Sequence, residues 1–446
     1  MYNYVHTLGT IPSKVELPLL NQYVDNYLFS LIVGLRQGEF GHNTVIRASK
    51  YIRDLRLALG ADKKLFIDSG GYSIIVGDVP FKSIKKCIEC YNYYLQTFAP
   101  TDCDYMLSLD IPIFLNEPKN NTSHNIYTWN RESIRQSKDI LQANPLLYEK
   151  FAFVWHFKIL KQFNIWRTVY DEFFRDNTLR NYAIGGLVSL RGITNINFSP
   201  FIVPAFKILK LLCDQGIRGR SLLHILGVYH KYDRFILMFM DKLFNNHYLK
   251  DKDLEIQLTF DTVNYTISGL YKIREMPILL LDEETNEIVQ KTAHELVDEL
   301  DSLISDPEIS NMIKAEMGRI CAKESLDNPK LVSLLMVVYN QTLDRIMEKV
   351  IEEENLINIF LEAKNPNNFI NYFSNVFTKW DKKYPFAFRG MKNNLCENFR
   401  WLKSCDQLWN MGADEKQWDN AVIKFLTRIN FPFDLTGDFN YERQTS

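Results

Sequence analysis

Short apolar segments that alternate with helical patterns are the feature of this chain that most restricts its fold. The apolar segments are residues 27–33, 64–70, 105–112, 151–157, 182–188, 221–228, 255–262 and, as a weaker candidate, 277–281. Between them, residues 43–59, 80–98 and 201–216 carry apolar residues at helical spacing. Continuous apolar runs are typical of parallel strands covered on both faces. The alternation therefore predicts an α/β fold, a (β/α)8 TIM-type barrel, with an open doubly wound sheet as the alternative.

The character of the sequence changes near residue 282. From there the chain is first acidic and helical, and it continues with apolar residues at helical spacing. We therefore expect a β/α barrel over residues 1–281, with its core at about 25–281, and a mostly helical C-terminal domain over 282–446. For that domain, nucleic-acid recognition, self-association and docking of a partner protein all remain open.

Cysteine usage and the N-terminus bear on the compartment. The seven cysteines are odd in number and irregularly spaced, which favours a reducing environment over a disulfide framework. Cys87 and Cys90 form a CxxC inside a helical pattern, so we interpret them as buried structural thiols. The N-terminus lacks the features of a signal peptide, and no apolar run reaches the roughly 20 residues of a membrane helix. These features predict a cytoplasmic protein without a membrane partner.

Polar residues follow several of the predicted strands. Asp68, Asp110, His156, His224 and Asp261 each stand at the end of an apolar run. In β/α barrels the C-terminal ends of the strands form one mouth, where the active site lies. An ionised carboxylate beside a buried strand is costly without a partner or a function. The three aspartates are therefore candidate functional groups, although polar strand ends also arise simply because loops follow them.

The segment LFIDSGGY, residues 65–72, is the strongest local motif. Its two glycines, directly after Asp68 and Ser69, permit a tight turn and the close approach of a flat ligand to the backbone. Tyr72 would offer an aromatic face for stacking. An ordinary strand-to-helix turn is the alternative interpretation of this motif.

Four further motifs follow this one in order: SLDIP (108–112), AIGGLVSLRG (183–192), LLHILGV (222–228) and LTFDTVNY (258–265). Together the five resemble the tRNA-guanine transglycosylase superfamily over roughly residues 25–281. The resemblance implies a β/α barrel and a pentosyltransferase that exchanges a nucleobase through a covalent aspartyl intermediate, without a redox cofactor or nucleotide triphosphate.

The resemblance also implies roles for individual residues. Asp261 matches the nucleophile that attacks C1′, Asp68 matches the general acid/base, and Asp110 matches the carboxylate that reads the edge of the base. The further positions that it suggests for contact with the base are Ser69, Gly70, Tyr72, Gly185, Gly186, Leu187 and His224. His156, which departs from the family's pattern, is an additional candidate for contact with the base, with a structural role as the alternative.

These assignments agree with the chemistry of the reaction. Cleavage of an N-glycosidic bond builds positive charge at C1′, which a carboxylate stabilises or captures covalently. A second acidic group must carry a proton to or from the base. The N1–H and N2–H₂ donors of guanine are well matched by a carboxylate, which accepts two hydrogen bonds.

The sequence departs from the family at three places. The family's CxCxxC…H zinc motif has no counterpart, because no cysteine lies between Cys213 and Cys321, so we predict no metal and no cofactor. His156 stands near the position of a glutamine-glycine pair. Residues 264–267 replace an arginine-bearing stretch, and the candidates to replace its contacts with phosphate are Arg191, Arg218, Arg220 and Lys231. Ordinary solvated helix faces are the alternative explanation of those four cations.

Loss of the zinc motif favours the divergent branch of DNA-guanine transglycosylases, which place 7-deazaguanine bases such as 7-cyano-7-deazaguanine into DNA. The expected partners are a nucleic acid, DNA rather than tRNA, and a free 7-deazaguanine base. The net charge of −2 provides no strong field toward either polymer. A divergent tRNA-guanine transglycosylase, a non-catalytic nucleic-acid-binding barrel and an unrelated barrel enzyme of small-molecule metabolism remain as alternatives.

Overall fold

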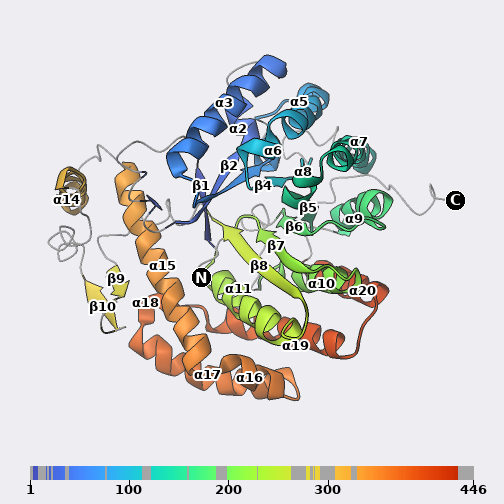
Figure 1. Cartoon of the computed structure of the whole chain (residues 1–446). Helices are drawn as coiled ribbons and strands as arrows, with labels where there is room; N and C mark the ends of the chain where they lie inside the picture. The colour runs from blue at the N-terminus through green and yellow to red at the C-terminus, as the bar shows by residue number, and fades with distance from the viewer. Residues whose placement is uncertain are drawn as a thin grey trace.

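Eight parallel strands close into a barrel in the computed structural model of the chain (Figure 1). They are β1 (Tyr4–Leu8), β2 (Asn26–Ser30), β3 (Lys64–Asp68), β4 (Tyr105–Leu107), β5 (Phe151–His156), β6 (Asn181–Gly185), β7 (Gly219–Ile225) and β8 (Leu254–Asp261). Each strand pairs with the next in the chain, and β1 closes the circle by pairing Tyr4 with Phe260 and Val5 with Asp261. The (β/α)8 prediction is confirmed, and the open sheet is excluded.

The structure describes most but not all of the chain. The described residues are 4–8, 17, 20–21, 24–35, 40–75, 78–112, 122–157, 160–186, 198–228, 230–262, 278–281, 285, 287–291, 307–322 and 329–429.

The helices between the strands surround the barrel. They are α2 (Leu31–Leu35), α3 (His42–Leu59), α4 (Gly71–Ile75), α5 (Ile84–Thr97), α6 (Ala99–Asp102), α7 (Ser123–Ala143), α8 (Pro145–Lys150), α9 (Leu160–Phe174), α10 (Ile202–Asp214) and α11 (Lys231–Leu243). Cys87 and Cys90 both lie in α5 and are buried, as expected of structural thiols, and burial raises their pKa values to about 12 and about 11. Within the described ranges, no helix combines the length and apolarity needed to cross a membrane.

One strand differs from the sequence-based prediction. The weaker candidate at 277–281 becomes β9 (Ile278–Leu281), which pairs antiparallel with β10 (Ile288–Lys291) outside the barrel. The eighth barrel strand is instead β1, so the barrel begins at Tyr4 rather than near residue 25. The prediction failed there because histidine and threonine interrupt the apolar residues of the strand at Tyr4–Leu8.

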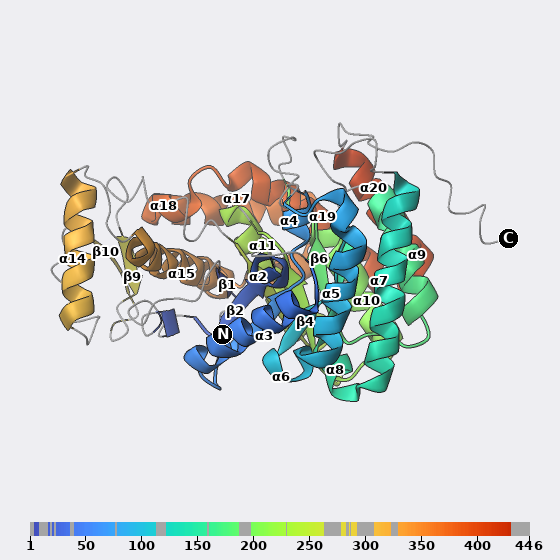
Figure 2. The same cartoon turned by 90° about the horizontal axis from the view of Figure 1, so that it is seen from above.

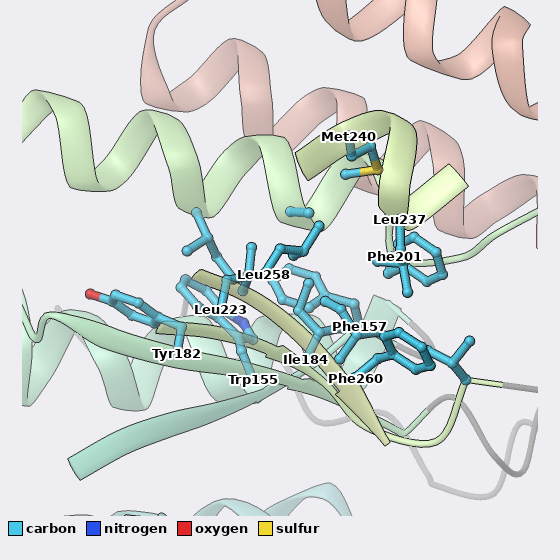
Figure 3. Packing of buried hydrophobic residues seen from close by; sticks show 14 of the residues in the cluster. Trp155, Phe157, Tyr182, Ile184, Phe201, Leu223, Leu237, Met240, Leu258 and Phe260 are labelled. Atoms are coloured by element: carbon cyan, nitrogen blue, oxygen red, sulfur yellow. The ribbon is translucent and has the colours of Figure 1, made fainter. Parts of the chain in front are cut away.

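Side-chain alternation along the strands separates the barrel interior from its outer layer. The apolar residues of the interior are Val5, Leu28, Phe66, Leu107, Ala152, Val154, Ala183 and Leu222. Their neighbours in the strands point outward and pack against the helices, as Figure 3 shows for Trp155, Leu223 and Leu258 near Met240 of α11. Positions two residues beyond the interior apolar layer therefore face inward at the C-terminal end of the barrel.

A layer of helices covers one side of the barrel after residue 306 (Figures 1 and 2). It consists of α15 (Pro329–Glu353), α16 (Leu356–Glu362), α17 (Pro366–Lys383), α18 (Pro385–Phe388), α19 (Lys392–Asn410) and α20 (Glu415–Ile429). The helix α14 (Pro307–Ala322) contacts α15 and lies farther from the barrel (Figure 1). Helices α15, α19 and α20 pack on α10 and α11 of the barrel, and their apolar residues join the same hydrophobic cluster. The predicted helical C-terminal region is confirmed, and it shares its core with the barrel.

Candidate active site

The inward-facing residues at the C-terminal ends of the strands are polar on several neighbouring strands. Asp68 ends β3, His156 ends β5 and Asp261 ends β8, each two residues beyond an inward-facing position. Asp110 follows β4 after a short connection. Parallel strands in a barrel all end at the same mouth, so the fold brings these predicted residues together.

Asp110 is the centre of a buried hydrogen-bond network. The Ser69 hydroxyl donates to its Oδ1 over 2.7 Å, and Nε2 of His156 lies 2.6 Å from its Oδ2. All three side chains are almost completely buried. Each oxygen of Asp110 thus already has one partner, and a carboxylate retains further lone pairs for a ligand.

Asp68 has a strongly perturbed acidity. Burial is the main cause that raises the pKa of Asp68 to about 8, and the negative charges of Asp110 and Asp261 add to it. The backbone N–H groups of Gly70 and Ser69 oppose this shift, and the first donates to Oδ2 of Asp68 over 3.0 Å. Asp68 is therefore a carboxylic acid that carries its proton near neutral pH.

The two glycines of the DSGGY motif are required by close packing. Gly70 has a φ of 94°, and a Cβ there would lie 2.5 Å from Cβ of Ile32. A Cβ on Gly71 would lie 2.6 Å from Oδ2 of Asp110. The turn from β3 to α4 therefore lies against Ile32 at Gly70 and against the Asp110 carboxylate at Gly71, which explains why this strand end needs two residues without side chains.

Asp261 is held by groups from β1, from the end of β7 and from the turn after it. The backbone N–H of Gly227 donates to Oδ1 over 2.7 Å, and the Thr7 hydroxyl donates to Oδ2 over 3.3 Å. Nε2 of His224 lies 3.5 Å from Oδ1. Gly227 has a φ of 70°, a backbone conformation that favours glycine and presents its N–H to the carboxylate.

His224 lies beneath Asp261 and is completely buried. Its Nδ1 is 2.9 Å from the hydroxyl of Thr259, and its ring packs 5.5 Å from that of Phe66. The structure therefore places His224 against the carboxylate of Asp261, and its contact with the base stays a prediction.

His156 combines one strong partner with one unsatisfied atom. Its ring stacks on that of Trp166 with the centroids 5.2 Å apart, while its Nδ1 is buried without a hydrogen-bond partner in the described part of the chain. A Cβ on Gly185 would lie 3.1 Å from Nε2 of His156, so the glycine leaves room for the imidazole. Gly186, with a φ of 81°, continues this strand end. An unsatisfied buried nitrogen at the mouth is suited to bind a polar ligand.

Three of the predicted residues cannot be placed. Leu187 and Arg191 lie outside the described residues, and of Tyr72 only the backbone, in α4, is described.

The predicted cations lie at different ends of the barrel. Arg218 and Arg220 stand at the start of β7, about 13 Å along the strand from its polar end, and Arg220 pairs with Glu255 at 3.3 Å. They are on the opposite face from the carboxylates. Lys231, the first residue of α11, lies at the mouth end, and burial lowers its pKa to about 8.

Sequence reasoning missed three residues of this arrangement: Thr7, Gly227 and Thr259. Gly227 and Thr259 fall inside motifs that were recognised, so their spacing to His224 and Asp261 was the available signal. No signal pointed to Thr7, because its strand was not recognised and lies more than two hundred residues from Asp261 in the chain.

The zinc site of the resembling family does not fit the residues present. No cysteine lies between Cys213 and Cys321, and among the described residues no group of three or more His, Cys, Asp or Glu side chains is placed to hold a metal ion. Residues 263–277, which follow Asp261, lie outside the described part.

The fold and the site define the class of protein: a (β/α)8 barrel with three carboxylates and two buried histidines at its mouth. Comparisons with models of protein families and with curated proteins found no match.

Proposed function

We propose that the protein is a base-exchange glycosyltransferase that replaces guanine in DNA with a 7-deazaguanine. The observation that carries this proposal is the pair Asp68 and Asp261 at one mouth, where burial and neighbouring charge raise the pKa of Asp68 to about 8. Base exchange needs a nucleophile together with an acid that still holds its proton near neutral pH, and the pair supplies both.

In the first half of the reaction, a carboxylate oxygen of Asp261 attacks C1′ of the deoxyguanosine. The bond from C1′ to N9 breaks, its electron pair leaves with the base, and Asp68 gives its proton to the leaving guanine. The deoxyribose is then bound covalently to Asp261, and Asp68 is a carboxylate. Gly227 and Thr7 hold the carboxylate of Asp261 in place for the attack.

In the second half, the incoming 7-deazaguanine loses its N9 proton to Asp68. Its N9 forms a bond with C1′ while the bond from C1′ to Asp261 breaks. Asp68 ends protonated and Asp261 ends as a free carboxylate, so protons and electrons balance without a cofactor. A base must leave the DNA stack to reach such a site, and a barrel mouth suits a flipped nucleotide.

Recognition of the base falls to Asp110 and His156 in this proposal. The lone pairs that remain on Asp110 accept from the N1–H and N2–H₂ groups of a guanine edge. His156 is held against this carboxylate by the hydrogen bond of its Nε2, and its unsatisfied Nδ1 offers a further contact to the base. Both guanine and a 7-deazaguanine carry this edge, as base exchange requires.

The test is a trapping experiment. The protein is incubated with guanine-containing DNA, or with unmodified tRNA in a parallel arm, and the products are separated under denaturing conditions. We expect a protein–DNA adduct, and exchange of labelled guanine for 7-cyano-7-deazaguanine. Asp261→Asn abolishes both, whereas Asp68→Asn slows the release of guanine.

The control variant is Asp214→Asn, which changes an exposed aspartate of α10 and leaves the adduct unaffected. Absence of exchange with both polymers, together with no effect of Asp261→Asn, would refute the proposal. Exchange on tRNA but not on DNA would refute DNA as the substrate and would favour the alternative of a divergent tRNA-guanine transglycosylase.

A further inference from the structure

The turn from α17 through α18 into α19 carries a group of exposed cations. Lys382 and Lys383 end α17, Arg389 follows α18, and Lys392 begins α19. All four are exposed. We call these four residues the basic strip.

The cations of the basic strip have no anionic partner among the described residues. Elsewhere in the helices cations are commonly paired, as Lys242 is with Glu352 at 2.6 Å. Lys379, one turn earlier in α17, also pairs with Glu354 at 2.5 Å and is therefore not part of the strip. Lys383 lies over the rings of Trp380 and Tyr384, 5.5 Å and 5.1 Å from their centroids. A chain with a net charge of −2 thus concentrates uncompensated positive charge here.

Ring contacts show which end of the barrel the strip occupies. Helix α11 starts at the mouth, after β7, and runs toward the other end of the barrel. Along it, the ring of Phe235 packs against that of Phe373, with the centroids 6.0 Å apart. The ring of Phe239 packs in the same way against that of Phe369, with the centroids 6.3 Å apart. Helix α17 therefore runs antiparallel to α11, and its C-terminal end lies at the mouth.

Two further observations agree with this placement. The charge of Asp381 acts on Lys231, the first residue of α11, which puts the end of α17 close to the start of α11. Figure 2 shows α17 and α18 at the same end of the molecule as α4, the helix that follows Asp68.

Among the described residues, the acidic side chains near the strip form no ion pair with it. Asp381 is partly buried and acts on Lys231, and Glu354 pairs with Lys379. Glu397 pairs with Arg400 at 2.8 Å and with Arg428 at 3.6 Å. The two lysines at the end of α17 also complement its helix dipole, but Arg389 and Lys392 lie beyond that helix and gain nothing from it.

We propose that the basic strip binds the phosphate backbone of the DNA whose base enters the barrel. This inference rests on the proposed function for its choice of DNA. Phosphate binding by lysine and arginine supplies affinity without reading sequence, and it positions the strand for the groups that do read the base. The strip provides the phosphate contacts that Arg218 and Arg220, on the opposite face, cannot provide.

The test is a binding titration in which the protein is added to a short fluorescent DNA duplex that contains guanine. Binding is measured as the fluorescence anisotropy of the duplex at several salt concentrations. We compare the wild-type chain with the triple variant Lys382→Ala, Lys383→Ala, Arg389→Ala. Each lost phosphate contact lowers the slope of log affinity against log salt by about 0.9. We expect the triple variant to bind about tenfold more weakly or worse near 0.15 M salt, with a slope reduced by about 2 to 3.

The matched control is the triple variant Arg218→Ala, Lys250→Ala, Lys252→Ala. It removes the same charge from exposed positions before β7 and β8, at the opposite end of the barrel. Equal losses in the two variants, or no loss in the first, would overturn the proposal, as would tRNA binding at the strip more tightly than the duplex.

The trapping experiment on the same proteins separates this inference from the proposed function. Salt-dependent binding at the strip without any covalent adduct supports the surface and refutes base exchange. An adduct that forms equally well in wild type and in the first triple variant, with unchanged affinity, supports base exchange and refutes the surface.

Discussion

Asp68 and Asp261 have the same side chain but different surroundings. Asp68 lies near two other carboxylates and holds a proton, with its pKa raised to about 8. Asp261 accepts hydrogen bonds from Gly227 and Thr7. Two carboxyl groups with such different surroundings can serve as acid and as nucleophile in one site. At the scale of residues, the proposed function therefore assigns the two aspartates different roles on the basis of burial and hydrogen bonding rather than of residue type.

The acidity of Asp68 predicts the pH dependence of the first step. In the proposed mechanism adduct formation needs the protonated form, so we expect its rate to fall as the pH rises through about 8. Asp110→Asn removes one of the two charges that raise the pKa of Asp68, and the descending limb shifts to lower pH. Rates of adduct formation between pH 6 and 10 measure this. If the rate fell over the same pH range in the wild-type protein and in Asp110→Asn, a group other than Asp68 would control the step.

The same carboxyl lowers the stability of the fold at high pH. Its folded pKa of about 8 exceeds the unfolded value of 3.8, so between these values the folded protein holds a proton that the unfolded chain has lost. Rising pH therefore costs the folded state free energy across this window. We expect Asp68→Asn to raise the free energy of unfolding by about 1–3 kcal/mol at pH 8 and by little at pH 4. Urea unfolding at the two pH values checks this, and equal effects at both would contradict it.

In the proposed function His224 acts as a positioning residue, because it is fully buried and its Nε2 lies 3.5 Å from Oδ1 of Asp261. We expect His224→Ala to lower kcat for base exchange about tenfold or more and to leave KM for the free base nearly unchanged. Thr259→Val removes the partner of Nδ1 and should give a smaller loss of the same kind. A rise in KM with unchanged kcat would indicate direct contact with the base.

At the scale of elements, the strand ends were predictable and the closing strand was not. Apolar runs followed by polar residues located β3, β5 and β8 together with their aspartates and histidine. The strand β1 is short and partly polar, while residues 277–281 are more apolar but pair outside the barrel. Local apolarity predicts that a segment forms a strand. It does not predict which strand it joins, because pairing depends on contacts distant in the chain.

The turn from β3 to α4 gives a test at this scale. Gly71→Ala places a methyl group within 2.6–2.8 Å of the Asp110 carboxylate, so it should displace Asp110 and break its bonds to Ser69 and His156. We expect base exchange to fall by two orders of magnitude or more, about 3 kcal/mol in transition-state free energy. The control, Gly216→Ala, meets no atom within 4 Å and costs only the strain of its positive φ, about 1 kcal/mol of stability. Retained activity in Gly71→Ala would show that Asp110 can move without loss.

At the scale of the whole molecule, the C-terminal helices are fixed to the barrel by more than apolar contact. Lys207 of α10 and Asp419 of α20 pair at 3.3 Å, and both are almost completely buried. Arg167 of α9 also reaches Asp419, at 2.8 Å. The ring of Trp418 stacks on that of Phe206 beside them, with the centroids 6.0 Å apart. The sequence predicted a helical region after residue 282, but these contacts between distant segments were not readable from it.

Asp419 pairs with two cations, Lys207 and Arg167, so the stability of the helical layer should respond differently to loss of the aspartate and to loss of the lysine. Asp419→Ala leaves the Lys207 ammonium buried without its carboxylate and should cost about 3–5 kcal/mol of stability. Lys207→Met should cost less, because Asp419 keeps Arg167 as a partner. Asp214→Ala, which breaks an exposed pair in α10, should cost at most about 1 kcal/mol. Urea unfolding of the three variants measures these differences.

The shared core determines the form of that unfolding curve. Because the apolar residues of α15, α19 and α20 belong to the same cluster as those of α10 and α11, the barrel and the helical layer should unfold in one transition. Asp419→Ala should therefore shift the whole curve to lower urea, with far-UV circular dichroism and tryptophan fluorescence moving together. If Asp419→Ala instead split the curve and left a later transition at the wild-type midpoint, the helical layer would unfold independently and the ion pair would stabilise only that layer.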